Sequence, residues 1–186
     1  MSSETEIASN ALSKIGASPI TSISDDTSTG AVLCRAYYYN TRDAVLRAYP
    51  WNCAIVRTSL AADTTAPTWK YAYKFLLPVN PYCLRLLEVE GNPEYKIAGR
   101  YIETDESSIN IKYIKRISDT GLFDALLQEA IECRLAAELA FPITGNSALI
   151  NAMWSLYGEK LREARTTDGM EVEQDSWESN ALTECR

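Results

Sequence analysis

Two pairs of adjacent carboxylates are the residues of this chain best suited to acid–base chemistry. Asp25-Asp26 and Asp105-Glu106 could each offer the two carboxyl groups that glycoside hydrolysis needs. Neighbouring residues of a strand point to opposite faces, which argues against joint action of Asp105 and Glu106. Asp25 and Asp26 precede a helical pattern, where carboxylates cap free N–H groups and offset the helix dipole. Capping therefore explains the first pair, and a small carboxylate-dependent glycan hydrolase stays as an alternative function.

Histidine is absent from the sequence, which removes histidine-based triads and most zinc sites. The five cysteines are odd in number, widely spaced and lack any C-x-x-C pair. They are Cys34, Cys53, Cys83, Cys133 and Cys185. This pattern predicts free thiols in a reducing compartment, with no metal and no cofactor.

Length and composition indicate a globular chain of ordinary type. Its 186 residues, 46% of them apolar and 23% charged, suit one domain or one domain with an insertion. The net charge of −7 argues against a free-standing nucleic-acid-binding protein, which carries a basic patch. The sequence has no N-terminal signal and no run of 18 apolar residues, so we expect neither secretion nor a membrane span.

Two helices are expected before the first sharp corner. A capping box at Ser3 and Glu6 begins one helix, which Gly16 ends. A longer helical pattern covers residues 27–48 and stops at Tyr49-Pro50-Trp51, because proline cannot continue the helix. The large indole of Trp51 then serves as an anchor in the core.

The pattern of residues 27–48 separates a buried stripe from a polar side. The stripe comprises Ala31, Cys34, Tyr38, Thr41, Val45 and Ala48, with Arg35, Arg42, Asp43 and Arg47 off it. After the corner, Ala54 to Leu60 is interpreted as a further short helix, and Ala61 to Thr68 as a linker.

Residues 69–117 are predicted to form a small antiparallel β unit inserted into the helical chain. Strand patterns lie at residues 71–77, 83–90 and 109–117. Between them, Gly99-Arg100 is a two-residue loop of the type II′ hairpin, with Tyr101 opening the return strand. In that register Lys96 faces Glu103 and Ile97 faces Ile102.

The remainder returns to helix and ends in an acidic segment. A helix from Phe123 is expected to end at Pro142, and a last long helix begins at Thr144-Gly145-Asn146-Ser147. Residues 171–186 hold five acids and one arginine, with Val172, Trp177 and Leu182 as apolar residues. Such a segment is typical of an arm that orders on a partner, and the alternative is a frayed tail with a chance aromatic.

The predicted fold class is therefore α+β: a mainly helical bundle with an inserted antiparallel β unit and an extended C-terminal arm. The helical body comprises residues 1–68 and 118–169, the β insertion residues 69–117, and the arm residues 170–186.

Several stretches, taken in order, resemble one known family. The most specific is Arg42-Asp43-Ala44-Val45-Leu46-Arg47-x-Tyr49-Pro50-Trp51-Asn52. The others include Ile15-Gly16-Ala17-x-Pro19-Ile20-Thr21-Ser22, Trp69-x-Tyr71-Ala72-Tyr73, Tyr95-x-Ile97-x-Gly99-Arg100, Tyr113-Ile114-x-Arg116-Ile117 and Leu135-Ala136-Ala137-Glu138-Leu139-Ala140. Over about residues 8–166 they resemble the tail tubular protein A family, the head-to-tail adaptors of tailed bacteriophages, chiefly short-tailed ones. Cys53 departs from this pattern, since phenylalanine is expected after Trp-Asn.

The resemblance implies a structural function without catalysis. Such adaptors form a ring, usually of twelve copies, between the portal protein and the tail nozzle protein, and double-stranded DNA passes through the lumen. It implies a helical ring body, a β insertion whose hairpin at Gly99, Arg100 and Tyr101 faces the nozzle, and a C-terminal arm that reaches the portal. The family's tail is variable, so no residue of the arm is carried over from it; Val172, Trp177 and Leu182 are expected to bind the portal because they are the apolar residues of this acidic segment. It also implies synthesis in the bacterial cytoplasm and a place at the head–tail junction of the virion. A monomeric binding module is the second alternative.

Overall fold

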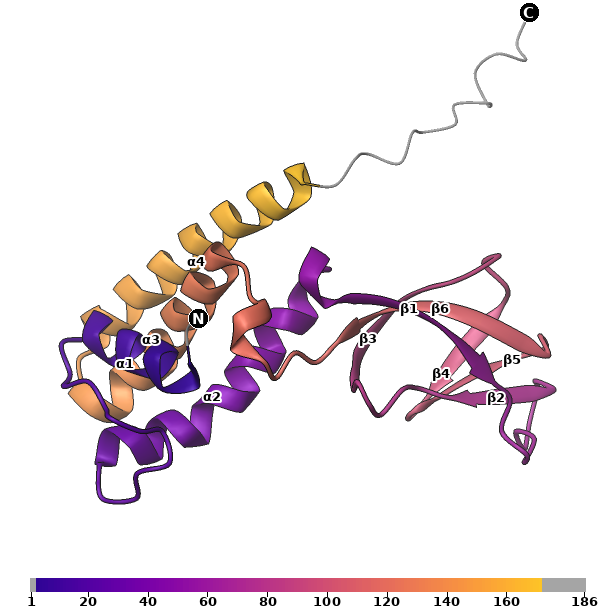
Figure 1. Cartoon of the computed structure of the whole chain (residues 1–186), viewed down its shortest axis with the longest axis horizontal. Coiled ribbons are helices and arrows are strands. Elements are labelled where there is room, and N and C mark those ends of the chain that lie inside the picture. Colours follow the sequence, from indigo (N-terminus) through magenta and orange to yellow (C-terminus); the bar gives the residue numbers. More distant parts are fainter. Residues whose placement is uncertain (1–2, 172–186) are drawn as a thin grey trace, which may run out of the picture.

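Helices and sheets occupy opposite ends of an elongated molecule (Figure 1). The computed structural model describes residues 3–171. Over this part of the chain it contains four α-helices and two three-stranded antiparallel sheets. The predicted α+β class is therefore confirmed.

The first two helices begin and end largely as their sequences predict. Helix α1 (Glu4–Lys14) begins where the Ser3 side chain accepts a hydrogen bond from the Glu6 N–H. It ends before Gly16, whose φ of +75° lies in the left-handed region that glycine favours. Helix α2 (Thr29–Ala48) is capped by Ser28.

Helix α3 (Ala125–Thr144) lies at the centre of the helical end. Helices α1 and α2 and the long α4 (Ser147–Met170) all pack against it. The prediction that Pro142 ends this helix is wrong, because α3 continues to Thr144. The Gly145 N–H, at a φ of +63°, then donates to the Phe141 carbonyl and closes the helix. A proline in the last turn removes a single ladder bond, so the helix survives it.

The predicted helix from Ala54 to Leu60 is wrong, because this segment is strand β1 (Ile55–Ala61). A short 3₁₀ turn (Asn52–Ala54) separates it from the corner. β1 pairs with β6 (Ser108–Lys115), from Ile55 opposite Ile114 to Ala61 opposite Ser108. β3 (Cys83–Val89) lies on the other side of β6. β-Branched residues in the segment favour a strand, and a partner about fifty residues later supplies the hydrogen bonds.

The second sheet has the order β2-β5-β4 and contains the predicted hairpin. β4 (Tyr95–Ala98) and β5 (Tyr101–Thr104) pair so that Lys96 faces Glu103 and Ile97 faces Ile102, as predicted. Gly99 has a φ of +61° and Arg100 a negative one, as the first and second central residues of a II′ turn require. β2 (Tyr73–Leu76) pairs with the other side of β5.

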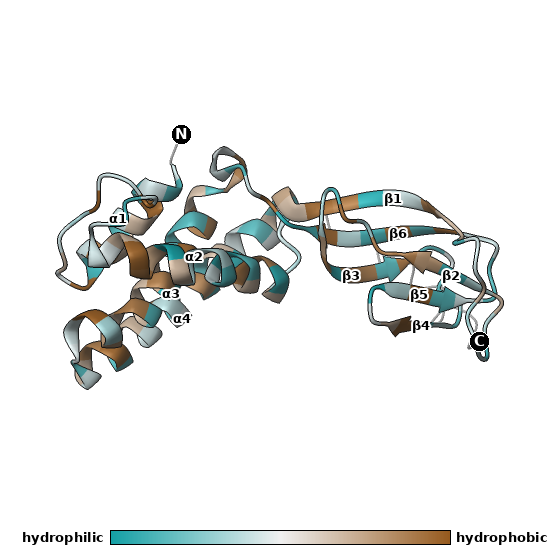
Figure 2. Cartoon of the chain, turned by 90° about the horizontal axis from the view of Figure 1, so that it is seen from below, coloured by the Kyte–Doolittle hydropathy of each residue, from teal (hydrophilic) through white to brown (hydrophobic). Residues whose placement is uncertain are grey.

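Two apolar clusters hold the molecule together. The smaller one lies between the two sheets and comprises Phe75, Leu77, Cys83, Val89, Ile102, Ile109, Ile111 and Tyr113. The larger one fills the helical end, and Leu84, Ile114 and Ile117 from the β end belong to it. In Figure 2, β1 is hydrophobic at both ends and hydrophilic between them. Because β3 and β6 contribute to both clusters, the helices and sheets meet in a packed joint.

Candidate functional site

The corner predicted at Tyr49-Pro50-Trp51 is a buried anchor at this joint. Trp51 is 1% exposed, and its Nε1 donates to the Val45 carbonyl at 3.1 Å. The Tyr49 ring meets the indole edge-on, with the centroids 4.9 Å apart. The apolar part of the indole is therefore buried, and its N–H has a hydrogen-bond acceptor inside the protein.

The same corner holds the end of α4, where the C-terminal segment begins. The Asn52 N–H donates to the Asp168 carboxylate at 3.1 Å, and the Asn52 amide donates to the Asp168 carbonyl at 2.7 Å. The Tyr49 hydroxyl donates to the Arg165 carbonyl at 3.3 Å. Burial raises the pKa of the Asp168 carboxyl, and the Asn52 N–H opposes this shift. Asp168 was missed from the sequence; its one signal was a carboxylate in the last helical turn, which the helix dipole disfavours.

A charged network lies on the other side of α2. Asp43 accepts from Arg42 Nη2 at 2.9 Å and from Arg116 Nε at 2.7 Å. Arg42 is only 4% exposed, with Glu4 at 3.8 Å and the Tyr39 ring at 5.4 Å. The expectation that Arg42 lies off the buried stripe is therefore wrong, and Ala48, placed on it, is exposed. A long guanidinium side chain can be buried where carboxylates and rings surround it, which periodicity alone does not reveal.

The hairpin tip lies against the joint. The Arg100 guanidinium donates to the carbonyls of Leu77 at 3.1 Å and Pro78 at 2.7 Å, and it stacks over the Tyr82 ring at 4.1 Å. Arg116 stacks over the same ring at 4.4 Å. The Lys74 ammonium group lies over the Tyr101 ring, 5.0 Å from its centroid. The tip therefore lies at the end of the β unit that adjoins α2.

These groups line one cleft, which we call the joint cleft, with a volume of about 660 Å³. Its walls come from α2, from β3 and the residue before it, from the hairpin and from the segment after β6. The lining residues are Asp43, Ala44, Arg47, Leu77, Tyr82, Cys83, Leu84, Arg85, Leu86, Ile97, Gly99, Arg100 and Arg116. Tyr82 and Arg85 were not singled out from the sequence as site residues, because only the fold brings β3 beside α2.

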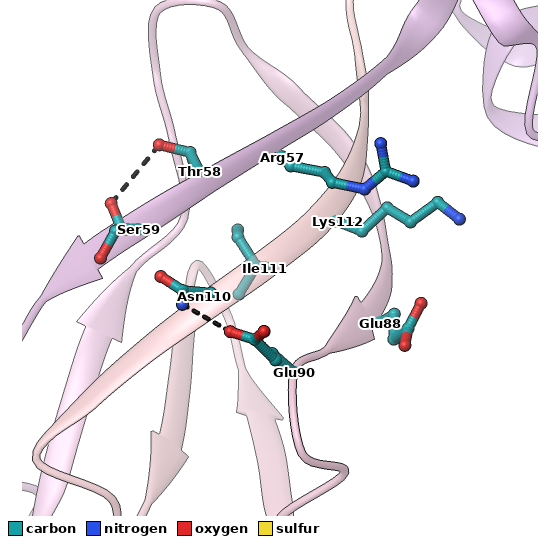
Figure 3. Close-up of a pocket in the computed structure, with 8 residues that line it drawn as sticks. All are labelled: Arg57, Thr58, Ser59, Glu88, Glu90, Asn110, Ile111 and Lys112. Carbon is teal, nitrogen blue, oxygen red and sulfur yellow. Dashed lines mark hydrogen bonds between the residues drawn. The ribbon is translucent and has the colours of Figure 1, made fainter.

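A second, smaller cleft of about 430 Å³ lies on the β1–β6–β3 sheet (Figure 3). Arg57 and Lys112 occupy opposite positions on β1 and β6, and Glu88 and Glu90 come from β3 and the residue after it. Asn110 donates to the Glu90 carboxylate at 2.5 Å. This second cleft is lined by charges of both signs, as is usual for a solvated face of a sheet.

The adjacent carboxylates make local contacts. Asp25 accepts from the hydroxyl of Thr27 at 2.7 Å and from its N–H at 2.8 Å, and these bonds lower the pKa of Asp25. Asp26 pairs with Arg35, and Asp105 accepts from the Ala72 N–H at 2.9 Å. The expectation that Asp25 and Asp26 cap the helix is wrong, because Ser28 is the N-cap of α2 and both carboxylates lie before it.

Other expectations concern metals, thiols, membranes and the arm. Among residues 3–171 no group of three or more cysteine, aspartate or glutamate side chains could hold a metal ion, and no helix is long and apolar enough to cross a membrane. The four cysteines of this range are unpaired, and burial raises the pKa of Cys53 beside the corner. Val172, Trp177 and Leu182 lie outside the described residues.

Comparison with known proteins gave no family. No protein-family model matches the sequence, and the search of curated proteins found no match.

Proposed function

We propose that this chain is a structural head-to-tail adaptor of a tailed bacteriophage. It would assemble as a ring of about twelve copies, with closed rotational symmetry, between the portal and a nozzle protein related to tail tubular protein B. DNA would pass through the lumen without specific binding, and no membrane is involved. The chain would be made in the bacterial cytoplasm and reside at the head–tail junction of the virion.

The observation that carries this proposal is the position of the stretch on which the resemblance is most specific. Residues 42–52 contain the Asp43 network, the Trp51 anchor and the contacts of Asn52 to α4. They therefore connect the helical end, the β end and the origin of the C-terminal segment. An adaptor that must hold a ring body, a tail-facing unit and a portal-binding arm in fixed relation needs such a junction.

The helical end supports lateral assembly. A ring requires two different surfaces on each subunit, because its contacts are heterologous. Val32 and Tyr39 are exposed on one face of α2, while Phe141 (64% exposed) and Trp154 (39% exposed) lie on α3 and α4. Helices α2 and α4 cover different sides of α3 (Figure 1). Two apolar surfaces on different sides of one body fit this geometry.

The β end would face the nozzle. Gly99, Arg100 and Tyr101 suggest this contact by resemblance, but the tip of their hairpin is engaged at the joint. The opposite end of the β unit presents the loop between β1 and β2, in which Trp69 is 78% exposed. We therefore place the nozzle contact at this loop, since an exposed tryptophan is a typical interface anchor.

The C-terminal arm would bind the portal through Trp177 and Leu182, with Val172 at its base. Deletion of residues 172–186 should leave thermal stability nearly unchanged and abolish portal attachment. Trp177→Ala alone should give most of the defect, about thirtyfold in affinity for each contact, multiplied by avidity around the ring. Normal decoration of portals by the deleted protein would contradict this assignment.

Negative-stain microscopy of the purified protein with its portal tests the proposal as a whole. We expect rings on the portal, and a mainly monomeric protein by size-exclusion with light scattering when the portal is absent. A stable ring of the lone protein at micromolar concentration would refute the dependence on the portal. Absence of any ring with the portal, or activity in a glycan-cleavage assay, would refute the adaptor itself.

A further inference from the structure

The joint cleft concentrates positive charge in an otherwise acidic protein. The whole chain has a net charge of −7. The cleft is lined by Arg47, Arg85, Arg100 and Arg116 against a single carboxylate, Asp43. Clefts with one sign of charge focus the field and attract the opposite charge.

The contacts of these arginines leave most of that charge uncompensated. Arg47 donates to the Leu84 carbonyl, and Arg100 donates to two carbonyls, which are neutral acceptors. Arg116 pairs with Asp43, but Asp43 also pairs with Arg42, which is buried. Arg85 is exposed on β3. The backbone bonds and the Tyr82 ring therefore hold the guanidinium groups in place while their charge remains available to an anion.

The cleft also borders a free strand edge. β4 is the terminal strand of the order β2-β5-β4, and Ile97 on it is half exposed at the cleft wall. An extended peptide can pair with such an edge through its main chain, while its side chains reach neighbouring groups. This favours an extended acidic peptide as the ligand.

We propose that the joint cleft binds the acidic C-terminal segment of the same chain, residues 172–186. This segment carries Glu173, Asp175, Glu178 and Glu184 with a single arginine, Arg186. With Glu171 before them, the first acids recur at every second residue, so an extended chain would present Glu171, Glu173 and Asp175 on one side. One such face matches a cleft lined by four arginines.

The segment starts close enough to reach the cleft. Asp168, in the last turn of α4, is bonded to Asn52, and Arg47 of the cleft lies in the last turn of α2, just before this corner. Fifteen extended residues can span roughly 50 Å. The proposal does not depend on ring assembly, because every group it uses belongs to one subunit.

Paramagnetic broadening in the full-length protein tests this directly. A nitroxide is attached to Cys185 in a Cys53→Ser background, since the other three cysteines are buried. In low salt we expect broadening of the amide signals of Arg85, Ile97 and Gly99. The signals of Ser59 and Asn110, on the β1–β6–β3 face of the second cleft, should stay sharp. Arg85→Glu should remove at least half of the broadening. Arg57→Glu, an equal charge change at an exposed residue outside the joint cleft, should not.

Three outcomes would overturn the proposal. The first is absence of broadening at the cleft, and the second is broadening that Arg85→Glu does not change. The third is broadening that reaches isotope-labelled, spin-free protein in a mixed sample, which would assign the contact to a second copy. Titration with inorganic phosphate is the companion measurement. Shifts at Arg85 and Gly99 without broadening from Cys185 would make the cleft a site for phosphate and refute the peptide.

Discussion

Two aromatic side chains lie at the joint between the helices and the sheets, and their surroundings are opposite in character. Trp51 is buried among apolar side chains and bonded to a main-chain carbonyl of α2. Tyr82 is partly exposed, and the guanidinium groups of Arg100 and Arg116 lie 4.1 and 4.4 Å from its ring centroid. One side of the joint is thus held by apolar burial and the other by charge.

The two sides of the joint are therefore expected to differ in how strongly their interactions depend on salt. Apolar burial is insensitive to salt, while interactions among partly exposed charges are screened at high ionic strength. The Trp51 side should therefore set the stability of the joint. The Tyr82 side can exchange charged partners without unfolding the molecule.

The largest expected effect is at Trp51. Trp51→Ala should lower the free energy of unfolding by about 3–5 kcal/mol, because a large buried side chain leaves a cavity. Urea denaturation measures the loss. Trp69→Ala removes the same side chain from an exposed loop and should change stability by less than about 0.5 kcal/mol. Equal losses of unfolding free energy for both variants would contradict the role of Trp51 as a core anchor.

Next in size is the network around Asp43. Asp43→Asn should cost about 2 kcal/mol, since buried Arg42 loses a charged acceptor while Glu4 remains at 3.8 Å. Asp26→Asn breaks the exposed pair with Arg35 and should cost about 0–0.5 kcal/mol. Thermal or urea unfolding of the two variants compares them, and a loss at Asp43 as small as that at Asp26 would argue against a structural network.

A smaller effect is expected at Tyr82. Tyr82→Leu removes a ring that faces two guanidinium groups and should cost about 1 kcal/mol, while Tyr82→Phe keeps the ring and should stay close to wild type. Unfolding at low and high salt should show the cost of Tyr82→Leu falling as salt rises. A cost that is independent of salt would show that packing, and not charge, dominates this side.

The smallest effect concerns the pH dependence at Asp168. Burial raises the folded-state pKa of this carboxyl above its ordinary value of 3.8, so the folded state binds the proton more tightly. Ionising this buried carboxyl lowers the stability of the folded state. This cost is absent below about pH 3.8 and becomes complete as the pH rises through the folded-state pKa. Asp168→Asn keeps an acceptor for Asn52 and should gain relative to wild type across that window, by less than about 0.5 kcal/mol. If Asp168→Asn instead became less stable relative to wild type as the pH rises, the pKa of Asp168 would be lowered by folding and not raised.

Local patterns were enough to predict elements whose determinants are close in sequence. The cap at Ser3, the left-handed stop at Gly16 and the register of Lys96 with Glu103 are as predicted. Each depends on residues within about eight positions, so hydrogen-bond geometry and side-chain alternation determine them. The Trp51 anchor follows from the same logic, because a proline break precedes a large apolar group.

Contacts between distant residues decided the rest. Ile55–Ala61 became a strand because β6 lies beside it, and Arg42 is buried where it approaches Glu4 of α1. Asn52 meets Asp168 across more than a hundred residues of chain. No local window contains these partners, so no periodicity could indicate them.

The sequence by itself therefore determined the class of fold, the corner, the hairpin and the acidic character of the C-terminal segment. Only the tertiary structure decided that Tyr82, Arg85 and the hairpin arginine meet Arg47 and Arg116 in one cleft. Local backbone and burial preferences act along the chain, whereas a charged site depends on the positions of side chains from separate elements. Those positions exist only after the helices and sheets have packed.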